Sequence, residues 1–341
     1  MDPLALTDGL ARLHIPSDSS PIAWVLHDGK AGMASQALGL AEATGFPFIE
    51  KRLAIRFPWA CLPPQLWFMP LRAAADSRAT LAPPWPDIVI GCGRNTAKPA
   101  LAIRRASGGQ TVAAQVQYPG VGRAEFDLLV VPEHDDLTGP RLVLTRGAVH
   151  RVTKARLAAE RLRFPALAEL PRPILSVLIG GTSNAYRLTL RRLGEIAEAL
   201  VAILRTDGGS VLLTASRRTG APALALLRRR LGGLSAAIWD GSGENPYYAY
   251  LALADALLVT ADSVSMISEA AATGKPVHVL GLDGGSTKLA RFHQSMQEAG
   301  ITRPFSGRIE CWSYAVPDDT ARAGATLRAL AMSRFERRER R

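Results

Sequence analysis

The stretch Ile22-Ala23-Trp24-Val25-Leu26-His27-Asp28-Gly29-Lys30-Ala31-Gly32-Met33 decides the fold of this chain. Its first six residues are mostly apolar and predict a buried strand over residues 22–27. The glycines that follow allow a tight turn, and residues 36–43 continue with helical periodicity. A strand that leads through a glycine turn into a helix is typical of a parallel βα unit.

The same alternation recurs in both halves of the chain. The first half predicts further strands over residues 87–90, 111–116, 127–131 and 141–144. The second half predicts strands over 174–179, 210–214, 256–260 and 277–280, with helices near 188–204, 221–231, 247–254, 264–273 and 289–299. Two such series indicate an α/β protein made of two Rossmann-like domains, because one core seldom serves more than about 250–300 residues.

The prolines at 165, 171 and 173 predict a linker over residues 164–173. We therefore expect an N-terminal extension (1–20), an N-terminal Rossmann-like domain (21–163), a C-terminal Rossmann-like domain (174–316), and a C-terminal helix with a basic tail (317–341). The Pro- and Trp-rich stretch 57–86 is expected to be an insertion. Ligands of open α/β sheets bind beyond the carboxyl ends of the strands, so the loops of both domains are expected to face one cleft.

The formal net charge is 41 − 30 = +11. Such an excess predicts attraction to phosphates, to nucleic acid or to an anionic membrane surface. No zinc-finger spacing and no basic motif interleaved with aromatics is present, so we expect no specific nucleic-acid partner. Part of the charge lies in residues 334–341, which we expect to be a frayed, solvated tail.

Several features predict a cytoplasmic protein. The cysteines at 61, 92 and 311 have no pairing or metal spacing, and the start Met1-Asp2-Pro3 does not resemble a signal peptide. No run approaches the roughly 18 apolar residues that span a bilayer. Any membrane attachment is expected to be peripheral, at the inner face of the membrane.

The loop after the first strand is a candidate anion site. Gly29 and Gly32 let the backbone bend before a helix N-terminus, and Lys30 would add a positive charge for a phosphate or carboxylate. The alternative is an ordinary βα turn capped by Asp28. Both interpretations fit the loop equally well.

The segment Gly91-Cys92-Gly93-Arg94-Asn95-Thr96 is a partial match to the dinucleotide-binding fingerprint. Its third glycine is missing, and Gln115-Val116-Gln117 follows in place of the acid that holds a ribose. We therefore expect no cofactor. Arg94 and Asn95 are nevertheless expected to face the cleft. A further cluster, Glu133-His134-Asp135-Asp136, could supply a general acid or base, although we expect it to form a solvated loop. Outside this cluster, no other evident hard ligands lie near Asp135 and Asp136 in the sequence, so we expect no metal site.

The second half carries two further candidate loops. In Gly180-Gly181-Thr182-Ser183-Asn184, backbone N–H groups and hydroxyls at a helix start would cradle a diphosphate. Asn245 precedes a short helix. Asp262, Ser263, Ser265 and Glu269 gather at another helix start, where Ser265 and Glu269, four residues apart, share a face. A structural N-cap accounts for one hydroxyl of residues 180–184. Packing accounts for the alanines at 270–272 but not for Asp262, Ser263, Ser265 and Glu269.

At these residues the chain resembles the GT-B class of nucleotide-sugar glycosyltransferases, especially the peptidoglycan N-acetylglucosaminyltransferase type. The resemblance implies that Gly181, Thr182 and Ser183 meet a donor diphosphate, with Ser263 and Ser265 beside it, and that Glu269 holds the ribose hydroxyls. Those enzymes commonly have a catalytic histidine in the first glycine-rich loop. Here Met33 follows Gly32, so His27 and Asp28 are the nearest candidate bases.

Over residues 23–320 the chain resembles more closely the mitochondrial-fission family of the "elongated mitochondria" (ELM) type. The matching motifs are Asp28-Gly29-Lys30-Ala31-Gly32, Ile179-Gly180-Gly181-Thr182-Ser183, Gly243-Glu244-Asn245-Pro246-Tyr247, Thr260-Ala261-Asp262-Ser263-Val264-Ser265-Met266 and Arg291-Phe292-His293. The resemblance implies the GT-B-like fold. It also implies a role as an adaptor as an alternative to catalysis, because the plant member recruits a dynamin-like GTPase.

Three hypotheses follow. The first is an inverting, metal-independent glycosyltransferase that uses a nucleotide-diphosphate sugar and an envelope glycan or lipid acceptor, with Asp28 as the base. The second is a non-catalytic adaptor. The third, a nicotinamide-dependent sugar-nucleotide epimerase, is weakened by the incomplete glycine fingerprint.

Overall fold

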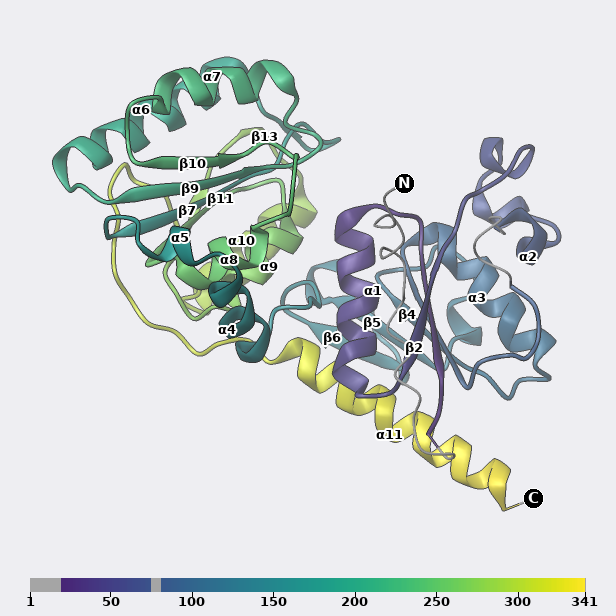
Figure 1. The fold of residues 1–341 in the computed structure, drawn as a ribbon. Coiled ribbons are helices and arrows are strands. Elements are labelled where there is room, and N and C mark those ends of the chain that lie inside the picture. The colour runs from purple at the N-terminus through teal and green to yellow at the C-terminus, as the bar shows by residue number, and fades with distance from the viewer. Residues whose placement is uncertain (1–19, 75–80, 341) are drawn as a thin grey trace, which may run out of the picture. The chain divides into compact units, whose positions relative to one another are not determined.

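The computed structural model describes residues 20–74 and 81–340. Strands in this part of the chain form two six-stranded sheets and a two-stranded one (Figure 1). The first sheet has the order β2-β1-β3-β4-β5-β6, and the second has the order β10-β9-β7-β11-β12-β14. The α/β fold class with two Rossmann-like sheets is thereby confirmed.

The first sheet is parallel where β1 pairs with β2 and β3, and where β3 pairs with β4. Its central strands are fully buried, which agrees with their continuous apolar sequences. Helices α1 (Ala31–Thr44) and α3 (Arg94–Ala106) pack against it. The strands are β1 (Ala23–His27), β2 (Phe48–Arg52), β3 (Ile88–Cys92), β4 (Val112–Val116), β5 (Leu128–Pro132) and β6 (Leu142–Thr145).

Short helices fill the connections of this first region. The predicted insertion holds two 3₁₀ turns, η1 (Trp59–Cys61) and η2 (Pro64–Leu66), and the one-turn helix α2 (Pro70–Ala73); its residues 75–80 lie outside the described residues. The remaining short elements are η3 (Arg123–Glu125), η4 (Glu133–Asp135), α4 (Lys154–Arg163) and α5 (Pro165–Ala168).

The second sheet has a helical layer on each face. Its elements are β7 (Ile174–Ile179), α6 (Leu190–Thr206), β9 (Ser210–Ala215), α7 (Ala221–Leu231), β10 (Ala236–Trp239), α8 (Tyr247–Leu253), β11 (Ala256–Thr260), α9 (Val264–Ala271), β12 (Val277–Leu280), α10 (Thr287–Glu298) and β14 (Thr302–Pro304). Strands β8 (Tyr186–Arg187) and β13 (Asp283–Gly284) form the small antiparallel sheet.

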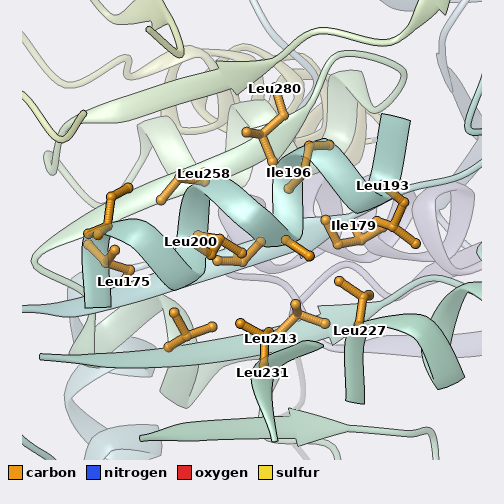
Figure 2. Packing of buried hydrophobic residues seen from close by; sticks show 14 of the residues in the cluster. Leu175, Ile179, Leu193, Ile196, Leu200, Leu213, Leu227, Leu231, Leu258 and Leu280 are labelled. Atoms are coloured by element: carbon orange, nitrogen blue, oxygen red, sulfur yellow. The ribbon is translucent and has the colours of Figure 1, made fainter. Parts of the chain in front are cut away.

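The alternation of side chains along β7 explains this layering. Leu175 and Ile179 point to the face covered by α6 and α7, where they meet Leu193 and Leu200 of α6 (Figure 2). Leu178 points to the opposite face and belongs to the cluster with α8, α9 and α10. Each buried leucine or isoleucine contributes about 1.5–3 kcal/mol through removal from water.

The chain divides into two compact units, and the boundary between them falls within β5. The first unit contains the residues up to Leu129 together with Gly324–Arg341, and the second unit is the continuous segment Val130–Ala323. The predicted linker at 164–173 stays a prediction. Among the described residues, no helix has both the length and the apolar character needed to cross a membrane.

The C-terminal helix α11 (Asp319–Glu339) corrects the expectation of a frayed tail. Arg334 Nη2 lies 3.0 Å from Asp127 Oδ1, and Arg338 Nη1 lies 2.7 Å from Asp87 Oδ1. Arg328 Nη1 donates to the carbonyl of Thr44 at 2.7 Å. The charged tail therefore continues as helix, because it pairs with carboxylates of the first unit that lie far away in sequence.

Candidate functional site

His27, at the end of β1, is buried and both of its ring nitrogens are engaged. Nδ1 accepts a hydrogen bond from the backbone N–H of Gly29 at 3.1 Å, and Nε2 lies 2.7 Å from Glu50 Oε1. Because Nδ1 is an acceptor, the neutral ring carries its hydrogen on Nε2 and donates it to Glu50. This arrangement holds the loop after β1 in place and leaves His27 poorly placed to accept a proton from a ligand.

Asp28, in the loop after β1, accepts hydrogen bonds from two other predicted site residues. Its Oδ2 accepts from Lys30 Nζ at 2.7 Å and from Asn95 Nδ2 at 3.1 Å, so three of the predicted site residues meet here. Burial raises the pKa of Asp28, but the hydrogen bonds and charge of Lys30, together with Asn95, outweigh it and leave the pKa below its ordinary value. Asp28 is therefore a stable anion and a weak base.

Backbone geometry explains the glycines of these first loops. Gly29 has φ +77°, and a Cβ there would lie 2.6 Å from Arg52 Nε. Gly93 has φ +79° and precedes α3, whose first residue, Arg94, is exposed. Gly32 lies in the first turn of α1, which begins at Ala31, so it is part of the helix and not of the turn before it, where the sequence predicted it. The glycines thus have a structural role whether or not an anion binds.

The glycine loop after β7 differs from the expectation in one respect. It does not open a helix: the chain continues into β8, and α6 starts only at Leu190, capped by Thr189. The helix-start interpretation of residues 180–184 was wrong because the chain first forms β8, which pairs in antiparallel fashion with β13. A helix dipole therefore does not contribute to this loop.

Two N–H groups of this loop are already bonded within the protein. Gly180 N donates to Thr260 Oγ1 at 2.8 Å, and Gly181 N donates to Asp262 Oδ2 at 3.1 Å. A Cβ at Gly180 would lie 2.2 Å from Asp262 Oδ1. The absence of a side chain at residue 180 is thus needed for the close approach of the Asp262 carboxylate.

Asp262 in turn is paired with a residue that the sequence did not indicate. Its side chain has 0% exposure, and Oδ2 lies 2.7 Å from Arg218 Nη2. Thr260 donates its hydroxyl to Asp262 Oδ1 at 2.7 Å. The guanidinium of Arg218 is 44% exposed and also faces the carbonyls of Gly181 and Thr182, at 3.3 and 3.4 Å. A buried carboxylate thus holds an arginine at the rim of the glycine loop.

The polar residues of the loop shape its turn. Ser183 Oγ accepts from the N–H groups of Ala185 and Tyr186, and Thr182 Oγ1 accepts from Leu188 N at 3.2 Å. Asn184 is exposed. Asn245 Oδ1 accepts from Tyr247 N at 3.0 Å, just before α8. These residues satisfy backbone donors, which is the structural role of hydroxyl and amide side chains in turns.

Helix α9 carries the remaining predicted residues. Ser263 is its N-cap and accepts from Met266 N at 3.3 Å. Ser265 is half-buried in the first turn, and Glu269 follows one turn later with an exposure of 5%. Tyr247 donates its phenolic hydrogen to Glu269 Oε2 at 2.5 Å. The acidic side chain is therefore buried and bonded, and does not lie on an outer helix face.

His293 lies beside the same loop system. Its Nε2 donates to the carbonyl of Ala261 at 2.9 Å, one residue before Asp262, and its ring contacts Tyr186. Burial lowers the pKa of His293, and the bond to Ala261 only partly offsets this. A neutral ring thus fixes the backbone that presents Asp262.

The cluster at η4 was expected to be solvated, which holds for Glu133 and Asp136. The side chain of Asp135 has 7% exposure and pairs with Lys288. Burial lowers the pKa of His134 to about 4, despite the opposing charge of Asp135. Helix α10 packs against η4, and this contact shields the side chains of His134 and Asp135 from water.

Sequence analysis missed Arg218, Thr260 and Tyr247 as members of the site. Arg218 lies in the loop after β9 and has no local motif, so only the fold places it near residue 262. Tyr247 was visible in a motif but carried no role. Among the described residues, no group of three or more His, Cys, Asp or Glu side chains is placed to hold a metal ion.

Solved structures with the same fold include UDP-N-acetylglucosamine 2-epimerases. One is a Listeria monocytogenes protein assigned to that activity, with a TM-score of 0.55, 13% identity, and coverage of 94% of this chain and 98% of that one. The epimerase of Methanocaldococcus jannaschii has a TM-score of 0.54 and 12% identity over 91% of this chain and 99% of its own. At this identity the likeness shows the fold alone, which is GT-B-like.

Two curated relatives match by sequence. The mitochondrial fission protein ELM1 of Arabidopsis thaliana is 36% identical over 280 residues, covering 74% of this chain and 65% of the plant protein. The chain thus spans slightly less than two thirds of that relative. The uncharacterized protein RP120 of Rickettsia prowazekii (strain Madrid E) is 26% identical over 333 residues, covering 85% of this chain and 93% of its own length.

The family model "Mitochondrial fission ELM1" matches residues 31–330. This match includes the glycine loop after β7, the Asp262 to Glu269 segment and the Arg291-Phe292-His293 motif. The resemblance noted from those motifs is confirmed. The chain belongs to the mitochondrial fission ELM1 family.

Proposed function

We propose that the second unit binds a nucleotide-diphosphate sugar along the start of α9. Arg218, Ser263 and Ser265 would contact the phosphates, and Glu269 would accept hydrogen bonds from the ribose hydroxyls. The observation that carries the proposal is the buried carboxylate of Glu269, one turn beyond Ser265 and held by Tyr247. A carboxylate offers about four acceptor positions, so Glu269 can accept from a ribose while keeping Tyr247.

The charges around the glycine loop support the phosphate part of this proposal. Arg218 is fixed by the buried Asp262 and remains 44% exposed, so its guanidinium is presented at a set place beside Gly181 and Thr182. Guanidinium groups bind phosphate oxygens in a bidentate fork. In this proposal Gly180 and Gly181 do not bind the diphosphate through their N–H groups. Gly180 leaves room for the Asp262 carboxylate, and Gly181 leaves room for the backbone of Arg218.

Comparison with solved structures gives further support. A Methanocaldococcus jannaschii epimerase was solved in complex with UDP-GlcNAc and UDP, and it resembles this chain with a TM-score of 0.50. For the present chain a uridine diphosphate sugar is therefore the first ligand to test.

Glycosyl transfer to an envelope glycan or lipid is the reaction that we propose for a catalytic form, with Asp28 as its base and Lys30 as a phosphate contact. A second candidate, a non-catalytic adaptor, is favoured by one observation. Asp28 is held as an anion by Lys30 and Asn95, and His27 is engaged through both nitrogens. A carboxyl with a lowered pKa accepts a proton poorly.

Calorimetric titration tests the binding proposal. UDP and UDP-N-acetylglucosamine should bind the wild type, and Glu269→Ala should weaken them by about 1.5–3 kcal/mol for each ribose hydrogen bond lost. Glu298→Ala removes the same charge from an exposed position of the same unit and should leave affinity unchanged. Equal affinity in wild type and Glu269→Ala would exclude the ribose role.

Turnover separates the two candidates. Wild-type protein is incubated with a panel of nucleotide-diphosphate sugars. The release of free nucleotide is measured, and nuclear magnetic resonance follows any change in the structure of the sugar. If the wild type releases free nucleotide and the Asp28→Asn variant releases less, glycosyl transfer is supported. Binding without release or epimerisation supports the adaptor, and conversion of the sugar without release indicates an epimerase.

A further inference from the structure

The first unit contains a cavity of about 530 Å³ at the amino ends of β3 and β4. It lies between the turn after α3 and the last turns of α11, and its lining includes Asp87, Gly109, Arg334, Arg337 and Arg338. The loops that carry Asp28 and Arg94 follow the carboxyl ends of β1 and β3. The cavity therefore lies at the opposite ends of the strands from these loops. Its volume is in the range of small-molecule sites, roughly 300–1,000 Å³.

The charges of this cavity do not balance. Three guanidinium groups line it, against the single carboxylate of Asp87. Arg338 is neutralised by Asp87 at 2.7 Å, and Arg334 by Asp127 at 3.0 Å, although Asp127 is shared with Arg104. The arginines therefore carry positive charge in excess of the carboxylates that pair with them.

Arg337 differs from its two neighbours. Its Nε donates to the carbonyl of Ser333 at 2.8 Å and its Nη2 to Ser333 Oγ at 3.0 Å. Among the residues whose side chains the structure describes, no ion pair to Arg337 is present, and the residue is exposed. The Ser333 contacts orient the guanidinium without neutralising it.

We propose that this cavity binds a phosphate ester, with Arg337 as the principal contact. A guanidinium oriented by neutral oxygens is suited to bidentate phosphate binding, and Arg334 and Arg338 strengthen the local positive potential. Val112, Ala331 and Phe335 add apolar surface to the lining, and Arg338 stacks on the Phe335 ring at 5.0 Å. The proposed ligand is therefore a phosphate ester whose organic group contacts this apolar surface.

Such a phosphate has two sources, a soluble ester or a lipid headgroup. Full-length protein is tested at about 0.15 M salt, where surface charges act only over roughly 8 Å. Glycerol 3-phosphate is titrated by calorimetry, and phosphatidylcholine vesicles with and without phosphatidic acid are tested by flotation. Saturable binding of glycerol 3-phosphate identifies a soluble ester, and binding to the phosphatidic acid vesicles alone identifies a lipid headgroup.

Matched variants decide whether the cavity is the site. Arg337→Gln should weaken the observed binding about tenfold or more, as expected for the loss of a charged hydrogen-bonded contact. Arg340→Gln removes the same charge from the same tail outside the cavity and should have little effect. Equal losses in the two variants would show diffuse attraction and overturn the proposal, as would no binding of wild type to either probe. Arg337→Gln should leave the affinity for UDP unchanged, which keeps this result separate from the nucleotide site.

Discussion

Tyr247 and Glu269, on two helices of the second unit, share a hydrogen bond of 2.5 Å between the phenol and a buried carboxylate. Burial raises the pKa of Tyr247 well above its ordinary value, and the charge of Glu269 adds to this effect. The tyrosine thus stays protonated and donates at any physiological pH. This pair joins the start of α8 to the middle of α9.

Tyr247→Phe removes the donor and leaves the Glu269 carboxylate buried with one partner fewer. We expect the free energy of unfolding to fall by about 1.5–3 kcal/mol, the range for hydrogen bonds to charged groups. Urea unfolding followed by circular dichroism measures the change. Tyr118→Phe, at an exposed position in the other unit, should change stability by less than about 0.5 kcal/mol. Similar small effects in both variants would argue against the bond.

Arg218→Ala should destabilise the second unit because it leaves Asp262 buried without its cation. Removal of one partner of a buried pair costs about 3–5 kcal/mol, and the 44% exposure of Arg218 reduces our expectation to about 1–3 kcal/mol. Arg217→Ala, the adjacent exposed arginine, is the control. In a double-mutant cycle, Asp262→Asn should recover part of the loss in Arg218→Ala; strictly additive effects would contradict the pairing.

Alanine at two glycines of the second unit should have opposite effects. Gly180→Ala places a methyl group 2.2 Å from Asp262 Oδ1, so we expect a loss of about 1–3 kcal/mol as Asp262 is displaced. At Gly194, inside α6, an added methyl group would meet no other atom within 4 Å, and Gly194→Ala should stabilise by about 0.5–1 kcal/mol. Thermal unfolding of both variants measures the contrast, and a stabilised Gly180→Ala would show that Asp262 does not need this space.

His150 should make stability fall in mild acid. Burial lowers its pKa to about 4, although Asp319 opposes the shift, whereas the unfolded chain binds a proton near pH 6.5. Neutral His150 therefore contributes to the free energy of unfolding above pH 6.5, and this contribution is lost as the pH falls toward 4. Between pH 7.5 and 5 the wild type should lose about 2 kcal/mol more than His150→Gln in urea unfolding. Parallel losses in the two proteins would contradict a neutral His150.

The buried strands could be predicted because they are continuous apolar runs. All the central strands of both sheets were found to within about two residues. Among the edge strands of the two large sheets, β6 was predicted but β2, β10 and β14 were not. An edge has one open side and tolerates polar residues, such as Glu50, Lys51 and Arg52 in β2. A two-residue strand such as β8 leaves no periodicity to detect.

The site was predictable only where its residues are close in sequence. Ser263, Ser265 and Glu269 were found because they lie on one helix, and Asp28 because it follows a strand directly. The pairing of Asp262 with Arg218 depends on the order β9-β7-β11, which brings the loops after these three strands together. No local pattern encodes that order, so the true partner of the glycine loop was not visible.

The first unit is built from two separate pieces of sequence, and this has a consequence for the timing of folding. A ribosome releases residues 324–340 only after the whole of the second unit has been made. The contacts of Arg328 with Thr44 and of Arg334 with Asp127 can therefore form only after residues 130–323 have been translated. The first unit begins to be translated first but is completed after the second, so nascent chains should expose the α11-binding surface of the first unit while the second unit is being synthesised.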